Sequence, residues 1–307
     1  MFSTKTKPSI FWVLIFSAFI FSCTEPQPIT LATYTYHTND RLDNMTPLAE
    51  LLSEKLEVPM ETKSYKDVES LIKGIQSGEA DIALINTLGY LLLSQTPYDA
   101  QPVAALKIPA AIQDNYKTVL LARAGLDLGN LDGLAQKADE LNLTLVNKGS
   151  TSGNLVPRLM LSSLGIDSPE NAFATLSYSG NHTEAMNRIL SGETDLAAFG
   201  SNEYFEQLEA KAEAGTQSQL VWISEEIPLG PVMVQNAIAP HRRQLIIDCL
   251  HGLDKEHPEV LEAIKGGWSE AKNASHYATV DETTYRSFSQ FEQRVVQLDK
   301  VLKTINE

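Results

Sequence analysis

The feature that most constrains the fold is a helix–turn–strand pattern that occurs twice in the chain. Ile75–Ala83 reads IQSGEADIA, and Ile189–Ala197, 114 residues later, reads ILSGETDLA. Each copy is the end of an amphipathic helix, a glycine stop, an acidic turn and a short buried strand. A common turn used twice by chance is the simpler alternative. Because both copies lie at similar places in halves rich in strand–helix–strand patterns, the repeat predicts two similar α/β domains.

The segments around the first copy alternate between strand and helix patterns. The apolar residues of the helical segments fall on one face, as in amphipathic helices. Thr46 and Pro47 suit the N-cap and first position of the first helix. This order favours a mostly parallel sheet with helices on its faces. The expected elements are strands at Ile29–Tyr36, Pro59–Lys63 and Asp81–Ile85, and helices at Met45–Leu56 and Lys66–Ser77.

Strand patterns also indicate where the chain passes between the two domains. Tyr116–Ala122 and Leu220–Ile223 read as strands on either side of the second copy of the repeat. The simplest arrangement has two domains. Residues 29–120 and 223–307 would form a discontinuous first domain, and residues 121–222 would form a second domain inserted into it. Two crossing strands would form a hinge, and a ligand is expected in the cleft between the domains. We therefore expect an α/β fold of two mixed sheets flanked by helices, with a two-strand hinge.

The first 28 residues predict an export signal and a tether. Two lysines precede an apolar run of 12 residues at positions 10–21, which fits a secretory signal and is shorter than the roughly 20 residues that span a bilayer. The run closes on Ser22 and Cys23, which resembles a bacterial lipoprotein signal and implies cleavage before Cys23 and lipid on its sulfur and amine. Residues 1–22 would be the signal peptide, and residues 23–28 would tether the protein at the periplasmic or extracytoplasmic face of a membrane. Plain secretion, with Cys23 there by chance, is the alternative.

Charge and cysteine content exclude several classes of function. The chain has 24 Lys and Arg against 39 Asp and Glu, a net charge of −15, whereas a nucleic-acid-binding protein needs a basic face. Its only cysteines are Cys23 and Cys249, so neither a disulfide framework nor a cysteine zinc cluster is expected. We expect no cofactor, no metal, no nucleic-acid partner, and a monomeric protein.

The segment with the clearest chemistry is a hydroxyl-rich loop at the start of a helix. Gly149–Gly153 reads GSTSG between the short strand Thr144–Val146 and a helix pattern. Its hydroxyls, on Ser150, Thr151 and Ser152, would lie where unpaired backbone N–H groups and the helix dipole favour an anion. A plain N-cap needs only one hydroxyl, and an anion site of this kind requires no lysine or arginine. We therefore expect a small anion to bind at these three residues.

The same loop leaves a catalytic alternative open. GSTSG fits G-x-T-x-G, one step from the G-x-S-x-G nucleophile elbow, in the same strand–turn–helix context. Its central residue, Thr151, is a poorer nucleophile there than serine, and the sequence singles out no Asp and His to serve it. Binding without catalysis is the main hypothesis, and a hydrolase that uses the GSTSG turn is the remote alternative.

Several motifs occur in one order along most of the mature chain. GSTSGNLVPR at Gly149–Arg158 is the most specific, and SGNH at 179–182 and VWISEEIPLGP at Val221–Pro231 follow it. Together they resemble the substrate-binding proteins of phosphate, phosphite and phosphonate ABC transporters, the PhnD-like family, over about Ile29 to Leu253. The resemblance implies a two-lobed periplasmic-binding-protein-like fold of type II that closes on a small anionic ligand. It also implies delivery of that ligand to an ABC permease in the membrane, which works with a cytoplasmic ATPase.

The resemblance also implies roles for individual residues. The three hydroxyls of the GSTSG loop would hold the phosphoryl oxygens of the ligand. Tyr65 and Tyr116 would donate phenolic hydrogen bonds from the first domain and the hinge, and His182 would close on the ligand from the second domain. Taken alone, His182 opens a helix, where it could equally be a surface cap, and the tyrosines could be ordinary packing residues.

One turn departs from the family pattern. Phosphonate binders of this family usually carry an acidic residue in the turn I-P-x-D-P, where this chain has Gly230. The family's second acidic group falls near Glu203, with a shift of one residue. Because glycine leaves room for a larger or fully ionised group and offers no charge to an amine, we expect that a zwitterionic aminophosphonate is not the preferred ligand. A local shift that lets Glu203, Glu225 or Glu226 supply the charge is the alternative.

A two-lobed protein that closes on a ligand could serve a function other than transport. An extracytoplasmic sensor would use the same two lobes to report the ligand to a membrane partner, and the chain alone does not separate the two. A neighbouring permease and ATPase gene pair would favour transport, and a neighbouring histidine kinase would favour sensing. The main hypothesis is a solute-binding lipoprotein that captures a phosphonate, phosphite or phosphate.

Overall fold

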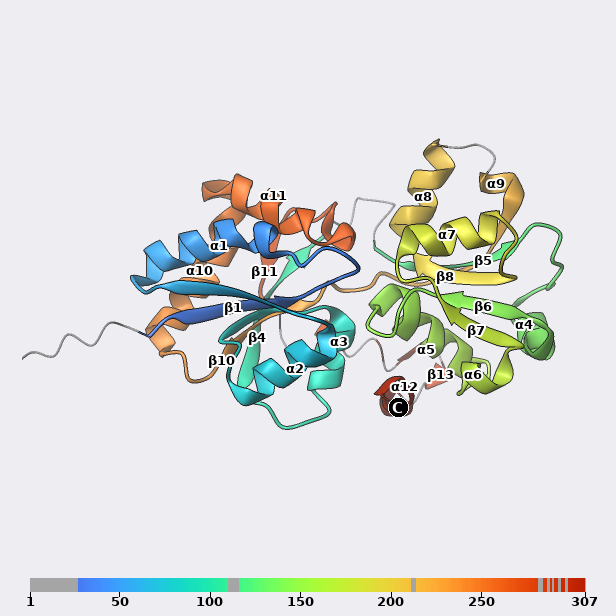
Figure 1. The fold of residues 1–307 in the computed structure, drawn as a ribbon, viewed down its shortest axis with the longest axis horizontal. Coiled ribbons are helices and arrows are strands. Elements are labelled where there is room, and N and C mark those ends of the chain that lie inside the picture. Colours follow the sequence, from blue (N-terminus) through green and yellow to red (C-terminus); the bar gives the residue numbers. More distant parts are fainter. Residues whose placement is uncertain are drawn as a thin grey trace, which may run out of the picture.

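The computed structural model describes residues 27–109, 116–210 and 214–280, and then 284–285, 288, 290–291, 294–295 and 298–306. The expected signal peptide, Cys23 and most of the tether lie outside the described residues. Two lobes lie side by side, one built around the strand β1 and the other around β6 (Figure 1). Among the described residues, no helix is long and apolar enough to cross a membrane.

The first lobe contains a six-stranded mixed sheet in the order β11-β4-β10-β3-β1-β2. Strand β1 is parallel to β2 and β3, and β10 is antiparallel to β3 and β4. The strands are β1 (Ile29–Tyr34), β2 (Met60–Tyr65), β3 (Ile82–Leu84), β4 (Ala100–Lys107), β10 (Pro231–Gln235) and β11 (His276–Ala278). The helices of this lobe are α1 (Leu42–Leu56), α2 (Val68–Ser77), α3 (Thr87–Leu93), α10 (Pro240–Glu256) and α11 (Pro258–Gly266), with a short 3₁₀ turn at Ser269–Ala271.

The second lobe contains a five-stranded mixed sheet in the order β7-β6-β8-β5-β9. Strand β6 is parallel to β7 and β8, whereas β5 is antiparallel to β8 and β9. The predicted fold class, two mixed sheets flanked by helices, is confirmed. The strands are β5 (Thr118–Arg123), β6 (Asn142–Leu145), β7 (Thr175–Tyr178), β8 (Leu196–Gly200) and β9 (Ser218–Ile223). The helices are α4 (Leu131–Lys137), α5 (Val156–Ser163), α6 (Pro169–Ala172), α7 (His182–Leu190), α8 (Ser201–Ala210) and α9 (Ala214–Gln217), with a 3₁₀ turn at Ala138–Glu140 and a π-helical turn, η2, at Thr151–Leu155.

The sequence repeat corresponds to the same carboxylate contact in both lobes. Asp81 accepts a hydrogen bond from the backbone N–H of Thr30 at 2.8 Å, which ties the start of β3 to β1. Asp195 accepts one from the backbone N–H of Asn142 at 2.9 Å, which ties the start of β8 to β6. In both repeats the acidic residue therefore sets the register of two parallel neighbours, which explains why the turn before the strand is acidic.

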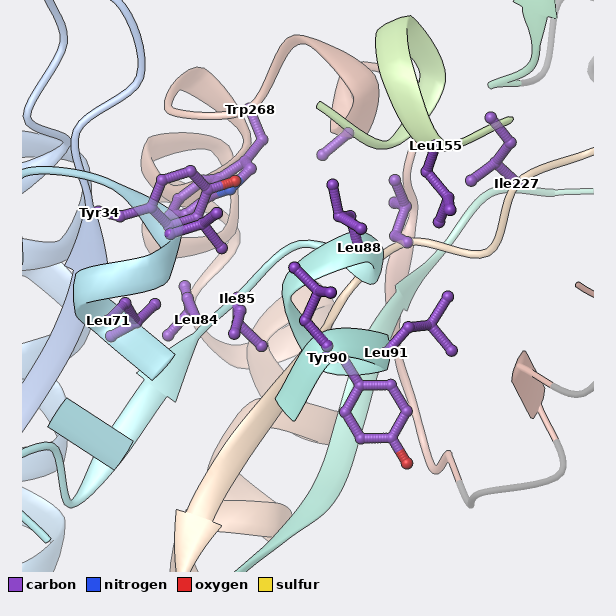
Figure 2. Packing of buried hydrophobic residues seen from close by; sticks show 14 of the residues in the cluster. Tyr34, Leu71, Leu84, Ile85, Leu88, Tyr90, Leu91, Leu155, Ile227 and Trp268 are labelled. Atoms are coloured by element: carbon purple, nitrogen blue, oxygen red, sulfur yellow. The ribbon is translucent and has the colours of Figure 1, made fainter. Parts of the chain in front are cut away.

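Two crossing segments join the lobes and lie side by side. The backbone N–H of Ile227 donates to the carbonyl of Tyr116 at 2.9 Å, and that of Ser224 donates to the carbonyl of Thr118 at 2.9 Å. Beyond this hinge, Leu88 in α3 packs with Leu155 of η2 and Ile227 in one apolar cluster that is continuous between the lobes (Figure 2). The contact places the N-terminus of α3 against the hydroxyl-rich loop of the second lobe.

The C-terminal part of the chain returns to the second lobe. Helix α12 (Leu298–Asn306) packs against α5, and its Lys300 Nζ lies 2.5 Å from Asp167 Oδ2 (Figure 1). The layout expected from the sequence assigned residues 223–307 to the first lobe and did not include this contact. A hairpin of β12 (Gln290–Phe291) and β13 (Arg294–Val295) precedes the helix.

Replacing Asp195 with Asn should destabilise the protein more than replacing Asp81 with Asn. Asp195 also accepts from Arg123 Nε at 2.7 Å and from Asn142 Nδ2 at 2.9 Å, and hydrogen bonds to charged groups contribute about 1.5–3 kcal/mol each. Burial alone would raise the pKa of Asp195, but the Arg123 and Asn142 donors outweigh it and hold that pKa below the ordinary 3.8. The stabilisation is therefore present above the unfolded pKa and lost as pH falls through the folded one.

Urea unfolding of the wild type and both variants between pH 3 and pH 7 measures this difference. The free-energy gap between wild type and Asp195→Asn should be largest near neutrality and should shrink in acid. A gap that stays constant with pH, or equal losses in the two variants, would contradict the assignment.

Candidate functional site

A cleft of about 340 Å³ opens between the lobes beside the hinge. Its wall combines residues of the hinge, the ends of β8 and α7, and the segment that follows α11. Clefts of this size between domains are where proteins commonly bind small molecules. The residues that line it are Tyr116, His182, Gly200, Asn202, Glu203, Glu206, Glu262, Lys265, Gly266, Ser269, Glu270 and Lys272.

The three hydroxyls of the GSTSG loop have three different surroundings. Ser150 is the N-cap of η2, and its Oγ accepts from the backbone N–H of Gly153 at 3.0 Å. Thr151 Oγ1 accepts from the backbone N–H of Leu88 at 3.0 Å, so it joins the two lobes. Ser152 is fully buried, at 0% exposure, and its side chain lies beside Tyr116, whose pKa it lowers; its Oγ makes no well-aligned hydrogen bond among the described residues. Ser152 is therefore the hydroxyl of this loop that neither caps the helix nor bonds to α3.

His182, the first residue of α7, lies next to Ser152 and has a defined tautomer. The backbone N–H of Gly200 donates to its Nδ1 at 3.0 Å, so Nδ1 is unprotonated and Nε2 carries the ring hydrogen. Burial lowers the pKa of His182 to about 4, so the ring is neutral at pH 7. A methyl group placed on Gly200 would lie 3.3 Å from Ser152 Oγ and 3.5 Å from the His182 ring. Ser152 and the neutral His182 ring therefore both lie beside Gly200 at the end of β8, and His182 lines the cleft.

Tyr36 is a member of this cluster that the sequence argument missed. Its ring stacks on His182 with 6.2 Å between centroids and an interplanar angle of 26°. Its buried Oη has no hydrogen-bond partner among the described residues, and burial, followed by the charge of Glu270, raises its pKa. The available signal was its position just beyond the carboxyl end of β1, where α/β proteins bind ligands. Tyr36 Oη and Ser152 Oγ are the two unsatisfied buried side-chain polar atoms in the described part of the chain.

Tyr116 lies at the cleft, as the resemblance implies, whereas Tyr65 does not. Tyr116 is 6% exposed and lines the cleft. Burial, and then the charge of Glu270, raises the pKa of Tyr116 well above its ordinary value. Hydrogen bonding with Ser152 lowers that pKa but does not offset the rise. Tyr65 instead directs its Oη to Glu79 Oε2 at 3.3 Å, in an exposed position, and its ring lies under Lys63 Nζ. The structure does not bring Tyr65 to the other predicted residues.

The two acidic positions of the family pattern differ in surroundings. Glu203 lines the cleft, and its carboxylate accepts from Thr183 Oγ1 at 2.9 Å and from Gln207 Nε2 at 3.1 Å. A Cβ on Gly230 would lie 1.9 Å from the carbonyl oxygen of Ile85, because the turn before α3 packs against it. The expected room for a larger ligand at Gly230 is therefore absent.

Helix N-termini contribute positive electrostatic potential to the interlobe surfaces. The N-termini of α2 and α7 and the start of η2 reach the interlobe surfaces, where Val68, Gly149, Gly180 and His182 line cavities. Each helix N-terminus carries a partial positive charge and unpaired N–H groups. The two lysines of the cleft are each ion-paired, Lys265 with Glu262 and Lys272 with Glu206. Within the described ranges, no group of three or more His, Cys, Asp or Glu side chains could hold a metal ion.

Comparison with known proteins agrees with this geometry. The model of a family described as the periplasmic substrate-binding protein of phosphonate ABC transporters matches residues 31–277. The chain belongs to this family. It is 25% identical over 236 residues to the phosphonates-binding periplasmic protein of Escherichia coli strain K12. The aligned region covers 75% of this chain and 67% of that protein.

Solved structures show the same fold. The binding component of an ABC phosphonate transporter from Pseudomonas aeruginosa is 18% identical, with a TM-score of 0.65 and coverage of 92% of this chain and 95% of that one. PhnD1 of Prochlorococcus marinus, solved in complex with methylphosphonate, is 19% identical, with a TM-score of 0.65 and coverage of 91% and 98%. At these identities the likeness establishes the two-lobed fold.

Alanine substitutions in the GSTSG loop should separate the cap from the ligand donor in the ligand-free protein. Ser150→Ala removes an N-cap and should cost about 0.5–2 kcal/mol of unfolding free energy. Ser152→Ala removes a buried hydroxyl that caps no helix and loses only its contact with Tyr116, so it should cost less unfolding free energy than Ser150→Ala. Chemical denaturation of both variants without ligand tests this; equal losses would mean that Ser152 has a structural partner.

Proposed function

We propose that this chain captures a small phosphonate between its lobes and passes it to an ABC permease. The observation that carries the proposal is a cluster of buried polar side chains between the lobes: Ser152 lies beside Tyr116, and Tyr36, whose Oη has no hydrogen-bond partner among the described residues, stacks on His182. A buried donor without an acceptor is unfavourable unless a ligand supplies one. The three oxygens of a phosphonate are such acceptors.

The proposed contacts are neutral donors. Ser152 and Tyr36 would donate their hydroxyl hydrogens, and His182 would donate from Nε2, whose hydrogen is fixed by the Gly200 contact at Nδ1. Tyr116 would contact the ligand from the hinge, where it lines the cleft. Hydrogen bonds from neutral groups to a charged acceptor are stronger than neutral pairs, so a strongly acidic protein can still hold an anion.

The other two hydroxyls would act on the protein itself. Ser150 stabilises the start of η2, and Thr151 joins the second lobe to the N-terminus of α3. Asn86 supports the same junction, because its Nδ2 donates to the carbonyl of Gly149 at 2.8 Å. We propose that these two contacts hold the lobes together around the ligand.

The arrangement supports binding over hydrolysis. The family is one of transport proteins and not of enzymes. A nucleophile elbow would need the Thr151 hydroxyl beside a general base, but that hydroxyl accepts from the Leu88 N–H. The Nδ1 of His182 is occupied by the Gly200 N–H, and its Nε2 carries a hydrogen, so the neutral ring has no acceptor left for a hydroxyl.

Isothermal titration calorimetry with methylphosphonate, phosphate and sulfate tests the ligand class. Ser152→Ala and Tyr36→Phe should each weaken methylphosphonate binding about 10- to 100-fold, since each removes a hydrogen bond of roughly 1.5–3 kcal/mol to a charged acceptor. Tyr65→Phe is the matched control and should leave the affinity unchanged, because its hydroxyl points to Glu79. Absence of binding to any phosphorus oxyanion would overturn the function, and a loss in Tyr65→Phe equal to that in Tyr36→Phe would overturn the assignment of the tyrosines.

We also propose that the protein is a lipoprotein anchored through Cys23. The support is the apolar run that closes on Ser22 and Cys23, together with the periplasmic family. Cys23→Ala should move the protein from the membrane to the soluble fraction, because the lipid would be its only strong membrane contact. Fractionation with a salt wash, with wild type and Cys249→Ala as controls, measures this; a Cys23→Ala variant that stays in the membrane would contradict the anchor.

A further inference from the structure

The last residue of the GSTSGNLVPR motif, Arg158, is a buried arginine outside the proposed ligand contacts. It lies in the first turn of α5 and is 3% exposed. Its Nε donates to Asn154 Oδ1 at 2.8 Å, and its Nη2 donates to Tyr178 Oη at 3.0 Å. Its Nη1 donates to Glu170 Oε2 at 3.2 Å, and its Nη2 also bonds to the other oxygen of that carboxylate. Because a buried charge is unfavourable unless it is paired and hydrogen-bonded, these contacts hold the guanidinium in one place.

Asn154 connects Arg158 to both ends of the hydroxyl-rich loop. It lies in η2, directly after Gly153, and is fully buried. Because its Oδ1 accepts from Arg158, its Nδ2 is turned the other way and donates to the carbonyl of Lys148 at 2.8 Å. Lys148 directly precedes Gly149, the first residue of the loop. One side-chain amide, oriented by Arg158, therefore spans the loop from its start to its end.

The backbone of this loop has an uncommon form that depends on such support. The N–H of Leu155 donates to the carbonyl of Ser150 at 3.1 Å, five residues back, in the π-helical turn. In an α-helix the same N–H would bond to the carbonyl of Thr151. Turns of the π type are rare, and they occur often at functional sites. A return to the regular register would rotate the loop hydroxyls, including that of Ser152, by about 100° relative to α5.

The outer end of this set of contacts lies away from the ligand. Glu170 is in the short helix α6 with its side chain 42% exposed, and Tyr178 ends β7. The hydrogen bond from Arg158 lowers the pKa of Glu170 below the ordinary 4.5, so that carboxylate is ionised at pH 7. Neither Arg158 nor Glu170 lines the interlobe cleft. Because Glu170 offsets the charge of Arg158, what the arginine supplies to the loop is geometry.

We propose that Arg158 is a positioning residue of the anion site: through Asn154 it holds the π-helical turn in the form that presents the Ser152 hydroxyl to a ligand. The inference rests on the proposed function, because the affinity changes in this way only if Ser152 contacts the phosphonate. Donors that are already ordered bind more tightly than donors that must first be ordered. Loss of Arg158 should therefore weaken binding without removing any ligand contact.

Calorimetry with methylphosphonate separates positioning from charge, because two variants change the charge in opposite directions. Arg158→Met removes a positive charge and Glu170→Ala removes a negative one, but both break the same set of contacts. Positioning predicts that both variants bind more weakly, Arg158→Met by about tenfold and Glu170→Ala by less. Attraction of the anion by charge predicts weaker binding in Arg158→Met and tighter binding in Glu170→Ala. Tighter binding in Glu170→Ala would therefore overturn the inference.

Two further variants serve as controls. Arg123→Met breaks another arginine–carboxylate pair of the second lobe, with Asp195, at the end of β5 far from the hinge, and should leave the affinity unchanged. Arg158→Lys keeps the charge but lacks the planar fork that joins Asn154 to Glu170, so it should not restore the affinity. An equal loss in Arg123→Met, or wild-type affinity in Arg158→Lys, would overturn the positioning role.

Nuclear magnetic resonance of the ligand-free protein tests the positioning itself. The backbone amide resonances of Gly149 and Gly153 should shift in Arg158→Met and Glu170→Ala but not in Arg123→Met, and unchanged resonances in Arg158→Met would overturn the inference. If Arg158→Met does not fold, since loss of one partner of a buried pair is strongly destabilising, Glu170→Ala carries both measurements. Wild-type protein that binds no methylphosphonate would overturn the proposed function and the inference with it. Wild-type binding that Arg158→Met leaves unchanged would overturn the inference alone.

Discussion

The contact between the N-terminus of α3 and the hydroxyl-rich loop is the interaction on which the site depends. Thr151 and Gly149 of the second lobe meet Leu88 and Asn86 of the first through two hydrogen bonds. The Leu88 side chain, which is fully buried, adds an apolar contact at the same place. This junction lies beside the hinge. It therefore fixes how far apart the lobes stand next to Ser152 and His182. Without it, the lobe surfaces that carry His182 and Tyr36 would not be held together in this arrangement.

The proposed anion site of this acidic protein draws largely on neutral groups. The lysines that line the cleft are engaged by glutamates, and the imidazole of His182 is kept neutral by burial. Attraction then comes from hydroxyl hydrogens, a ring N–H and helix N-termini, all of which act at short range. Such a site discriminates by the geometry of its acceptors more than by total charge.

The sequence predicted the features that have a local signal. Hydrophobic periodicity and the repeated acidic turn indicated two α/β lobes. The assignment of the three hydroxyls between glycines to a ligand stays a prediction. The start of α1 was wrong: the helix begins at Leu42, with Pro47 inside it, and not at the Thr46 cap. The helix follows a turn in which Arg41 adopts φ 63° and binds Gly267, 226 residues away, a tertiary contact with no local pattern. Tyr36 packs beside that same arginine, so its place next to His182 could not be derived from spacing.

The repeat nevertheless accounts for where the two halves of the site meet. Strand β1 of the first lobe and β6 of the second occupy equivalent places, each tied at its start to a repeat carboxylate. Tyr36 follows the carboxyl end of β1, and the hydroxyl loop follows the carboxyl end of β6, so equivalent edges face each other across the cleft. The edges differ in chemistry because one carries a phenol fixed by a buried arginine and the other carries small hydroxyls at a helix start. The repeated architecture therefore brings the phenol of the first lobe and the hydroxyl loop of the second to matching edges of their sheets.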